Sequence, residues 1–162
     1  MKACVVYDSR YGNTEQVAAS LEAGLKRAGV ETTCKNVKEV KEDALAACDL
    51  ICVGAPTEWL TASKPMRTFL ETLRGHTLSG KRGFAFDTKL ARPLSGSAAK
   101  LIEKELRARG IQLIAPHESA TVFLENGSTS GAWLKEGEKA RFEGVGQRIG
   151  AALASGDTCA VA

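Results

Sequence analysis

The sequence predicts an α/β domain in which a parallel sheet is covered by helices on both faces. Short continuous apolar runs alternate with longer segments of helical periodicity, and no linker or repeat interrupts the 162 residues. Residues 1–154 are expected to form this domain and residues 155–162 a flexible tail. Ligands of such sheets bind at the carboxyl ends of the strands, which directs attention to the loops after Tyr7, Val53 and Phe86.

The expected elements follow from apolar periodicity. Apolar runs predict strands over residues 2–7, 49–55 and 82–87, and a fifth strand in two pieces over 111–116 and 120–125. Residues 30–36 are more polar and predict a strand at or near the sheet edge. Helical spacing predicts helices over residues 13–28, 42–48, 64–74 and 97–110, and a last helix that carries Phe142, Val145, Ile149 and Ala152 on one face. Three glycines weaken this last helix, so it must depend on packing: Gly144, Gly146 and Gly150.

Local signals refine these boundaries. Asn13 or Thr14 is expected to cap the first helix, with Gln16 completing a capping box after Asn13. Ser95 or Ser97 is expected to cap the fourth helix. The dipeptide Asn126-Gly127 predicts a turn, and Trp133 is expected to latch the loop over residues 125–135.

Composition excludes several function classes. The net charge of +3, without a basic stripe interleaved with aromatic residues, argues against nucleic-acid binding. No apolar run is long enough for membrane insertion, and the start lacks the features of a signal peptide, so a cytoplasmic location is expected.

Cysteine and histidine positions suggest no metal site and no catalytic side chain. Five cysteines without a CxxC pair argue against zinc and against a complete disulfide framework. Cys4 and Cys52 lie in apolar runs and are expected to be buried thiols. His76 and His117 are expected to be structural or exposed.

The first loop, "DSRYGNT" over residues 8–14, has the character of a phosphate site. It joins a strand to a helix start, where unpaired backbone N–H groups and the helix dipole favour an anion. Gly12 lets the backbone curl, and Arg10 adds positive charge. Ser9, Asn13 and Thr14 add side-chain donors. The nucleotide-binding patterns GxxxxGK[ST] and GxGxxG are absent from this loop.

These residues resemble the flavodoxin family, and the similarity extends from "VVYDSRYGNTEQVA" through "ICVGAPTEW" and "FAFDTK" to the last helix. The hydroxyl-rich turn that holds the FMN phosphate in that family matches Ser9, Tyr11, Gly12 and Thr14, with Asn13 between them. The resemblance implies a flavodoxin-like three-layer sandwich. Its five-stranded parallel sheet would have the order 2-1-3-4-5, with non-covalent FMN between the second and third loops.

The other two loops supply the remaining candidate cofactor-binding residues. The second loop contributes Pro56, Thr57, Glu58 and Trp59, and the Trp59 indole is a large surface for stacking on a flavin ring. The third contributes Asp87, Thr88 and Lys89, which are expected to bind the polar edge of the ring or the ribityl chain. The resembled family usually has a tyrosine a few residues after this aspartate, where this chain has Leu90, Ala91 and Arg92.

The resemblance implies an electron carrier between redox partner proteins: a reductase or ferredoxin-like donor and an acceptor enzyme. Two alternatives stay open. The missing tyrosine and the basic residues Lys64, Lys89 and Arg92 favour an NAD(P)H-dependent quinone or flavin oxidoreductase of the same fold. The unusual third loop leaves room for a binding module that has lost flavin.

Overall fold

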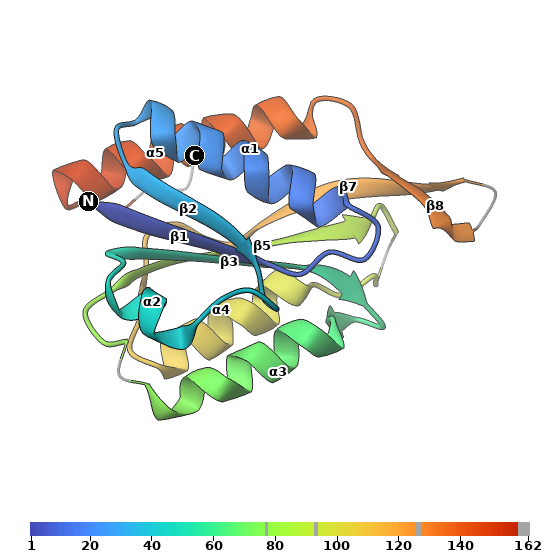
Figure 1. Ribbon diagram of the computed structural model, residues 1–162. Coiled ribbons are helices and arrows are strands. Elements are labelled where there is room, and N and C mark those ends of the chain that lie inside the picture. Colours follow the sequence, from blue (N-terminus) through green and yellow to red (C-terminus); the bar gives the residue numbers. More distant parts are fainter. Residues whose placement is uncertain (77, 93, 126–127, 159–162) are drawn as a thin grey trace.

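The structure is a computed structural model that describes residues 1–76, 78–92, 94–125 and 128–158. A twisted sheet lies between two layers of helices (Figure 1). Along the sheet the main strands are ordered β2 (Glu31–Asn36), β1 (Lys2–Tyr7), β3 (Leu50–Glu58), β5 (Arg82–Leu90), β7 (Glu118–Glu125) and β8 (Ser128–Leu134). The short strands β4 (Thr61–Ala62) and β6 (Gln112–Leu113) pair with β3 and β5.

The predicted fold class is confirmed. Strands β2, β1, β3, β5 and β7 are parallel neighbours and occupy the five positions of the expected 2-1-3-4-5 order. The fifth position is split as predicted, because β6 and β7 both pair with β5. The sequence did not predict β8, which pairs antiparallel with β7 and extends the sheet beyond five strands.

Alternating side chains divide the core between the two faces of the sheet. Ala3, Val5 and Cys52 pack beneath α1 (Asn13–Arg27) and α5 (Glu138–Ser155). Val6 and Val53 face the other layer, formed by α2 (Glu42–Ala46), α3 (Lys64–Thr72) with the 3₁₀ turn η1 (Leu73–Gly75), and α4 (Ala98–Ala108). Both faces are therefore buried, as the continuous apolar strands require. No helix among the described residues is long and apolar enough to cross a bilayer.

Helices α1 and α5 approach each other so closely that only glycine fits between them. A Cβ added at Gly24 of α1 would lie 2.0 Å from the carbonyl oxygen of Glu143. A Cβ at Gly146 of α5 would lie 2.3 Å from the carbonyl oxygen of Leu21. The sequence predicts that the glycine-rich last helix depends on packing, and this backbone contact with α1 is that packing.

The predicted capping box of the first helix is wrong. The residue before α1 is Gly12, at φ 82°, and no side chain caps the helix. Asn13 is instead the first helical residue, and its Nδ2 donates to the Ala132 carbonyl of β8 at 3.0 Å. Gln16 Nε2 donates to the Gly12 carbonyl at 3.2 Å. The Ser97 alternative for α4 is confirmed, because its Oγ accepts from the Lys100 amide at 3.3 Å.

The expectation of a free thiol at Cys4 is also wrong. Cys4 of β1 is buried as predicted, but its sulfur is bonded to that of Cys48, with the two Cα atoms 6.1 Å apart. Sequence spacing cannot reveal this pair, because the fold alone brings residues 44 positions apart together. Closing a loop of that length stabilises a fold by about 4 kcal/mol through loss of unfolded-chain entropy. Cys52 is a buried free cysteine, as predicted.

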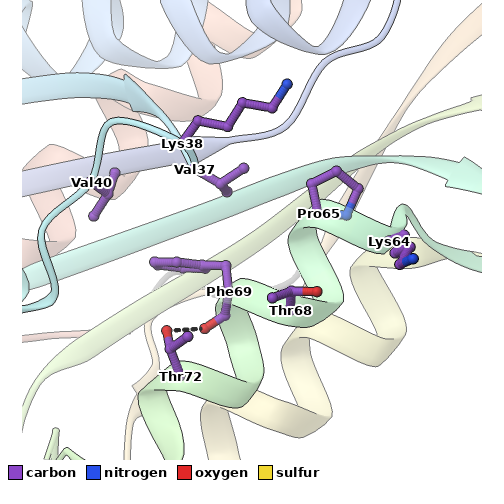
Figure 2. Close-up of a pocket in the computed structure, with 8 residues that line it drawn as sticks. All are labelled: Val37, Lys38, Val40, Lys64, Pro65, Thr68, Phe69 and Thr72. Atoms are coloured by element: carbon purple, nitrogen blue, oxygen red, sulfur yellow. Dashed lines mark hydrogen bonds between the residues drawn. The ribbon is translucent and has the colours of Figure 1, made fainter.

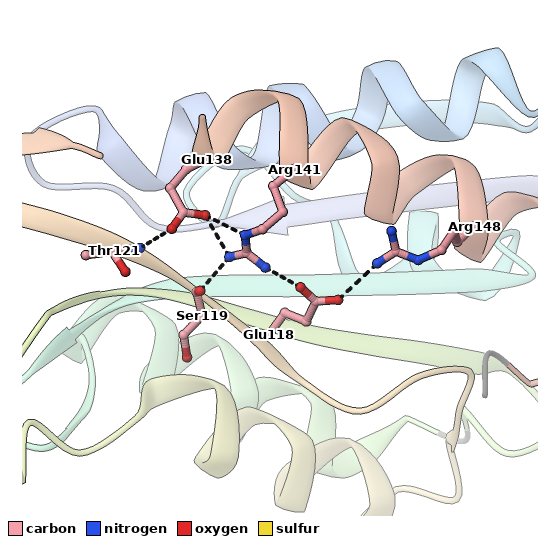
Figure 3. Close-up of polar contacts among 6 residues, drawn as sticks. All are labelled: Glu118, Ser119, Thr121, Glu138, Arg141 and Arg148. Carbon is pink, nitrogen blue, oxygen red and sulfur yellow. Dashed lines mark hydrogen bonds and ion pairs between the residues drawn. The ribbon is translucent and has the colours of Figure 1, made fainter. Parts of the chain in front are cut away.

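The β7–β8 hairpin projects from the sheet and is tied to α5 by a polar network (Figure 3). The buried Glu138 carboxylate accepts from the Thr121 amide at 3.1 Å and from Arg141 Nε at 2.7 Å. Arg141 also pairs with Glu118 and donates to the Ser119 carbonyl at 2.6 Å. The start of α5 therefore fixes the base of the hairpin.

Trp133 lies in β8 opposite Phe123 of β7, with ring centroids 6.2 Å apart. The sequence predicted Trp133 as a hydrophobic latch of a loop, whereas its contact joins two strands. The turn predicted at Asn126-Gly127 and the last four residues of the predicted tail, 159–162, lie outside the described residues.

We predict that Gly146→Ala destabilises the protein by about 2 kcal/mol, because the added methyl forces α5 away from α1. Gly144→Ala is the matched control. Its Cβ would meet only Arg148 Nη1, at 3.7 Å, so the helix should gain up to about 1 kcal/mol. Urea unfolding of both variants measures the difference, and equal effects would contradict the close contact.

Candidate functional site at the carboxyl ends of the strands

Three loops meet at the carboxyl edge of the sheet: residues 8–12 after β1, 59–63 after β3 and 91–97 after β5. Strands β3 and β5 run three residues further than the sequence predicts. The candidates Pro56, Thr57 and Glu58 therefore lie in a strand, as do the candidates Asp87, Thr88 and Lys89. Strand pairing gives these residues a more rigid setting than loops would.

The first loop has a buried side-chain donor without a partner and leads into a helix start without a side-chain cap. The first intrahelical bond of α1 runs from the Gln16 amide to the Gly12 carbonyl at 3.1 Å, so the earlier amides precede the helical ladder. Ser9 Oγ is buried and has no hydrogen-bond partner among the described residues. A buried hydroxyl without a partner costs free energy unless something outside the chain satisfies it.

The other side chains of this loop have partners within the protein. The Arg10 guanidinium lies 3.9 Å from the Glu58 carboxylate and 5.3 Å from the centre of the Tyr11 ring. Tyr11 is exposed. The Asn13 amide bonds to β8, as described above. Ser9 is therefore the residue of this loop whose buried polar side-chain atom lacks a hydrogen-bond partner among the described residues.

Hydroxyl groups tie the first loop to both of its neighbours. Ser63 Oγ, at the end of the second loop, donates to Asp8 Oδ2 at 2.5 Å. Thr14 Oγ1, in the first turn of α1, lies 2.8 Å from Thr88 Oγ1 of β5. All four residues are buried. These bonds fix the relative position of elements that lie up to 74 residues apart in the chain.

Asp87 is the centre of a second connection, between β3, β5 and α4. Its Oδ2 atom accepts from Thr57 Oγ1 at 3.0 Å, Ser97 Oγ at 2.7 Å and the Ala99 amide at 3.0 Å. Thr57 Oγ1 accepts in turn from the Ala98 amide at 2.9 Å. The carboxylate is fully buried at a helix N-terminus, where the dipole favours negative charge. Asp87 and Thr57 thus have a structural role that the sequence did not predict.

The second loop is a strained hairpin turn between β3 and β4. Its two central residues, Trp59 and Leu60, have φ of 49° and 71°, a conformation that glycine and asparagine adopt most readily. Trp59 is 96% exposed. Strain of this kind, at roughly 1–2 kcal/mol a residue, concentrates at functional sites.

The third loop is pressed against this turn. Leu60 and Gly96 form a parallel bridge, and a Cβ on Gly96 would lie 2.5 Å from the Leu60 Cα. Leu94 has φ 61° and is 93% exposed. Exposed apolar side chains on two joined, strained turns make this edge of the molecule suited to contact with another molecule.

A groove of about 400 Å³ lies between α3 and the segment after β2 (Figure 2). Val37, Val40 and Phe69 give it an apolar lining, and Lys38 and Lys64 add positive charge. The sequence singled out only Lys64. The groove could not be predicted, because it is formed by segments that become neighbours only when the sheet has folded.

Two other polar side chains have structural partners. His117 Nδ1 lies 2.6 Å from Glu103 Oε2, which agrees with a structural role for His117. Burial alone would raise the pKa of Glu103, but hydrogen bonds from His117 and the charge of Arg107 outweigh it and lower that pKa. Burial and a hydrogen bond to Glu15 raise the pKa of Tyr7 to about 12.

The family model of the flavodoxin domain matches residues 4–118, which include most of β1 and the three loops. The chain belongs to the flavodoxin family. A flavodoxin from Clostridium saccharobutylicum is 35% identical over 89 residues, which are 54% of this chain and 56% of that protein. An archaeal flavodoxin structure superposes with a TM-score of 0.78 at 25% identity and covers 95% of this chain and 99% of that chain.

Larger proteins also match this flavodoxin-family chain. A putative diflavin flavoprotein A 4 from Synechocystis is 37% identical over 119 residues, 68% of this chain but 19% of that protein. An NAD(P)H dehydrogenase (quinone) from Rhizobium rhizogenes is 34% identical over 100 residues, 49% of this chain and 50% of that protein. The matches thus cover between 19% and 56% of the length of these three relatives.

Flavodoxins bind FMN, and the residues of this chain fit its phosphate. The buried Ser9 hydroxyl lacks a partner, and the start of α1 has no side-chain cap. A phosphate would satisfy both kinds of donor at one place. Trp59, almost fully exposed, is available to the flat face of the ring.

We predict that Leu60→Gly stabilises the free protein by about 1 kcal/mol, because it removes strain at φ 71° with little loss of buried apolar surface. Thr61→Gly, one residue further along, is the matched control. It weakens a strand and should destabilise by about 0.5–1 kcal/mol. Thermal or urea unfolding of the two variants checks the prediction, and a destabilised Leu60→Gly would contradict the strained turn.

Proposed function

We propose that this chain binds FMN non-covalently and carries electrons between redox partner proteins. The observation that carries the proposal is the buried Ser9 hydroxyl, which lacks a partner beside the uncapped start of α1. Membership of the flavodoxin family supports it. Bound FMN supplies the electron-transfer chemistry, and the chain supplies binding, orientation and electrostatics.

The proposed phosphate site combines one side chain with backbone donors. Ser9 donates from its hydroxyl, and Gly12, at φ 82°, turns the backbone into the start of α1, where the amides of Asn13 and Thr14 donate. The side chains of Asn13 and Thr14 already bond to Ala132 and Thr88, so these two residues contribute through their amides. Arg10 and Tyr11 border this site.

The proposed ring site lies between the second and third loops. Trp59 stacks on the ring, and the backbone of Pro56, Thr57 and Glu58 borders its edge. On the other side, Lys89 follows the buried pair Asp87 and Thr88, which hold the loops in place. No side chain needs to act as an acid or base.

The charge and the exposed apolar side chains near the ring site predict the reduction potential and the docking surface of this carrier. Lys89 and the exposed Arg92 put positive charge near the ring site, which favours acceptance of electrons and raises the reduction potential. The exposed side chains of Trp59, Leu60 and Leu94 form an apolar rim on which a redox partner protein can dock.

We predict that the parent binds FMN about one to one, and binds it more tightly than riboflavin, which lacks the phosphate. Ser9→Ala should weaken FMN binding about tenfold, the effect of losing one hydrogen bond to a charged group, and leave riboflavin binding unchanged. Titration of flavin fluorescence measures both affinities. Ser155→Ala, at the distant end of α5, is the control.

Equal affinity of the parent for the two flavins would contradict the phosphate site. A parent that retains neither flavin would favour a binding module that has lost the cofactor. Trp59→Ala is expected to weaken both flavins, because stacking does not depend on the phosphate.

A second candidate function is an NAD(P)H-dependent quinone or flavin oxidoreductase. It is favoured by the end of β5 and the start of the third loop, where Leu90, Ala91 and Arg92 stand in place of the tyrosine usual in the family. Two Rhizobium relatives named NAD(P)H dehydrogenase (quinone) support it.

We predict that the FMN-loaded protein does not sustain NADPH oxidation with a quinone unless a partner reductase is added. Absorbance at the NADPH band measures the turnover. Sustained turnover without a reductase would overturn the carrier proposal in favour of the oxidoreductase. In that case Arg92→Glu should raise the KM for NADPH with little effect on that for the quinone, because it reverses a charge beside the ring site.

A further inference from the structure

The bonded pair Cys4–Cys48 lies at the wall of a second groove, on the face of the sheet that α2 covers. This groove has a volume of about 320 Å³ and is bordered by β1, β2 and the segment that contains α2. Cys4 and Cys48 both line it, and each is less than one-tenth exposed. The pair therefore borders the groove on one side and packs into the hydrophobic core on the other.

The surroundings of the two sulfurs suit both oxidation states. The Ala44 carbonyl lies 3.9 Å from Cys4 Sγ and 3.4 Å from Cys48 Sγ, so two thiols would find an acceptor already in place. Thr33 Oγ1 donates to Cys4 Sγ at 3.7 Å and can do the same to a thiolate. Reduction consequently leaves no buried donor without a partner, the penalty that would otherwise favour the bonded state.

Charge at the groove favours the nucleophile that exchange requires. Lys2, Lys35 and Lys41 line the groove together with Glu31 and Glu39, which leaves a positive balance. The attacking and leaving species in thiol–disulfide exchange are thiolates, and nearby ammonium groups stabilise them. The size of the groove and the burial of the sulfurs suit a small thiol better than the surface of a folded protein.

We propose that Cys4–Cys48 is a thiol–disulfide exchange site for a low-molecular-weight thiol of the glutathione class. It is independent of the proposed flavin site, and it does not require an oxidising compartment, because bonded cysteines in reducing compartments are mostly transient and redox-sensing. Reduction releases α2, a five-residue helix without a side-chain cap, from its covalent link to β1.

The exchange balances in two steps. A thiolate RS⁻ attacks one cysteine sulfur, the Cys4–Cys48 bond breaks, and a mixed disulfide forms while the other cysteine leaves as a thiolate and takes a proton. A second thiolate attacks the R sulfur of the mixed disulfide, and RSSR leaves as the remaining cysteine is protonated. Two RSH are oxidised to RSSR, and one protein disulfide is reduced to two thiols.

The test equilibrates the full chain, without denaturant, in buffers of graded reduced-to-oxidised glutathione ratio. Acid quenching, alkylation and peptide mass spectrometry then report the state of each cysteine. We expect Cys4 and Cys48 to change together in one transition, with a mixed disulfide to glutathione on one of them. A pair that stays bonded at every ratio and opens only in denaturant would overturn the proposal, as would a pair that stays reduced in excess oxidised glutathione.

Two variants separate exchange from general effects of thiols. The melting temperature of the parent should fall by roughly 10 °C on reduction, since a long loop is no longer closed. Cys34→Ser should keep this shift, because Cys34 is a free cysteine outside the pair. Cys48→Ser should lose it. If Cys48→Ser does not fold, the double variant Cys4→Ala/Cys48→Ala serves instead, and persistence of the shift in it would overturn the assignment.

Discussion

The arrangement of the three loops depends on the buried carboxylate of Asp87. One oxygen of this group accepts hydrogen bonds from Thr57, Ser97 and the first turn of α4, and so joins β3, β5 and a helix at one point. The hydroxyl pairs Thr14–Thr88 and Ser63–Asp8 extend the connection to the first loop. With these bonds in place, none of the loops can shift without breaking a buried polar contact.

Because these buried contacts hold the three loops rigidly, the exposed turn after β3 can keep an unfavourable backbone conformation. Trp59 and Leu60 keep positive φ because β4 pairs back onto β3 and the third loop packs against Leu60. An indole held almost fully in solvent does not stabilise the fold by burial. In the proposed flavin site this indole would be a preorganised stacking surface, which loses little freedom on binding.

Much of the fold could be predicted because it follows from local patterns. The bounds of β1 were predicted without error, and the loop over residues 8–14 carries its own helix start and glycine. No local pattern predicts the contacts that join distant segments, which are the Cys4–Cys48 bond, the Asp87 contacts and the Asn13–Ala132 hydrogen bond. Strand β8 was not predicted because its residues, "STSGAWL", include few apolar side chains. It forms as a strand through its antiparallel pairing with β7.

The glycine-mediated contact between α1 and α5 has a consequence for the order in which the protein folds. It joins α1 near the start of the chain to α5 near its end. During synthesis α1 therefore lacks its partner, and the sheet face that carries Phe84 and Phe86 stays partly uncovered until α5 emerges. Until then an apolar half of the sheet is open to solvent and to other chains. This protein therefore completes its fold only after the whole matched domain and α5 have left the ribosome, and chaperones can shield the open half of the sheet before then.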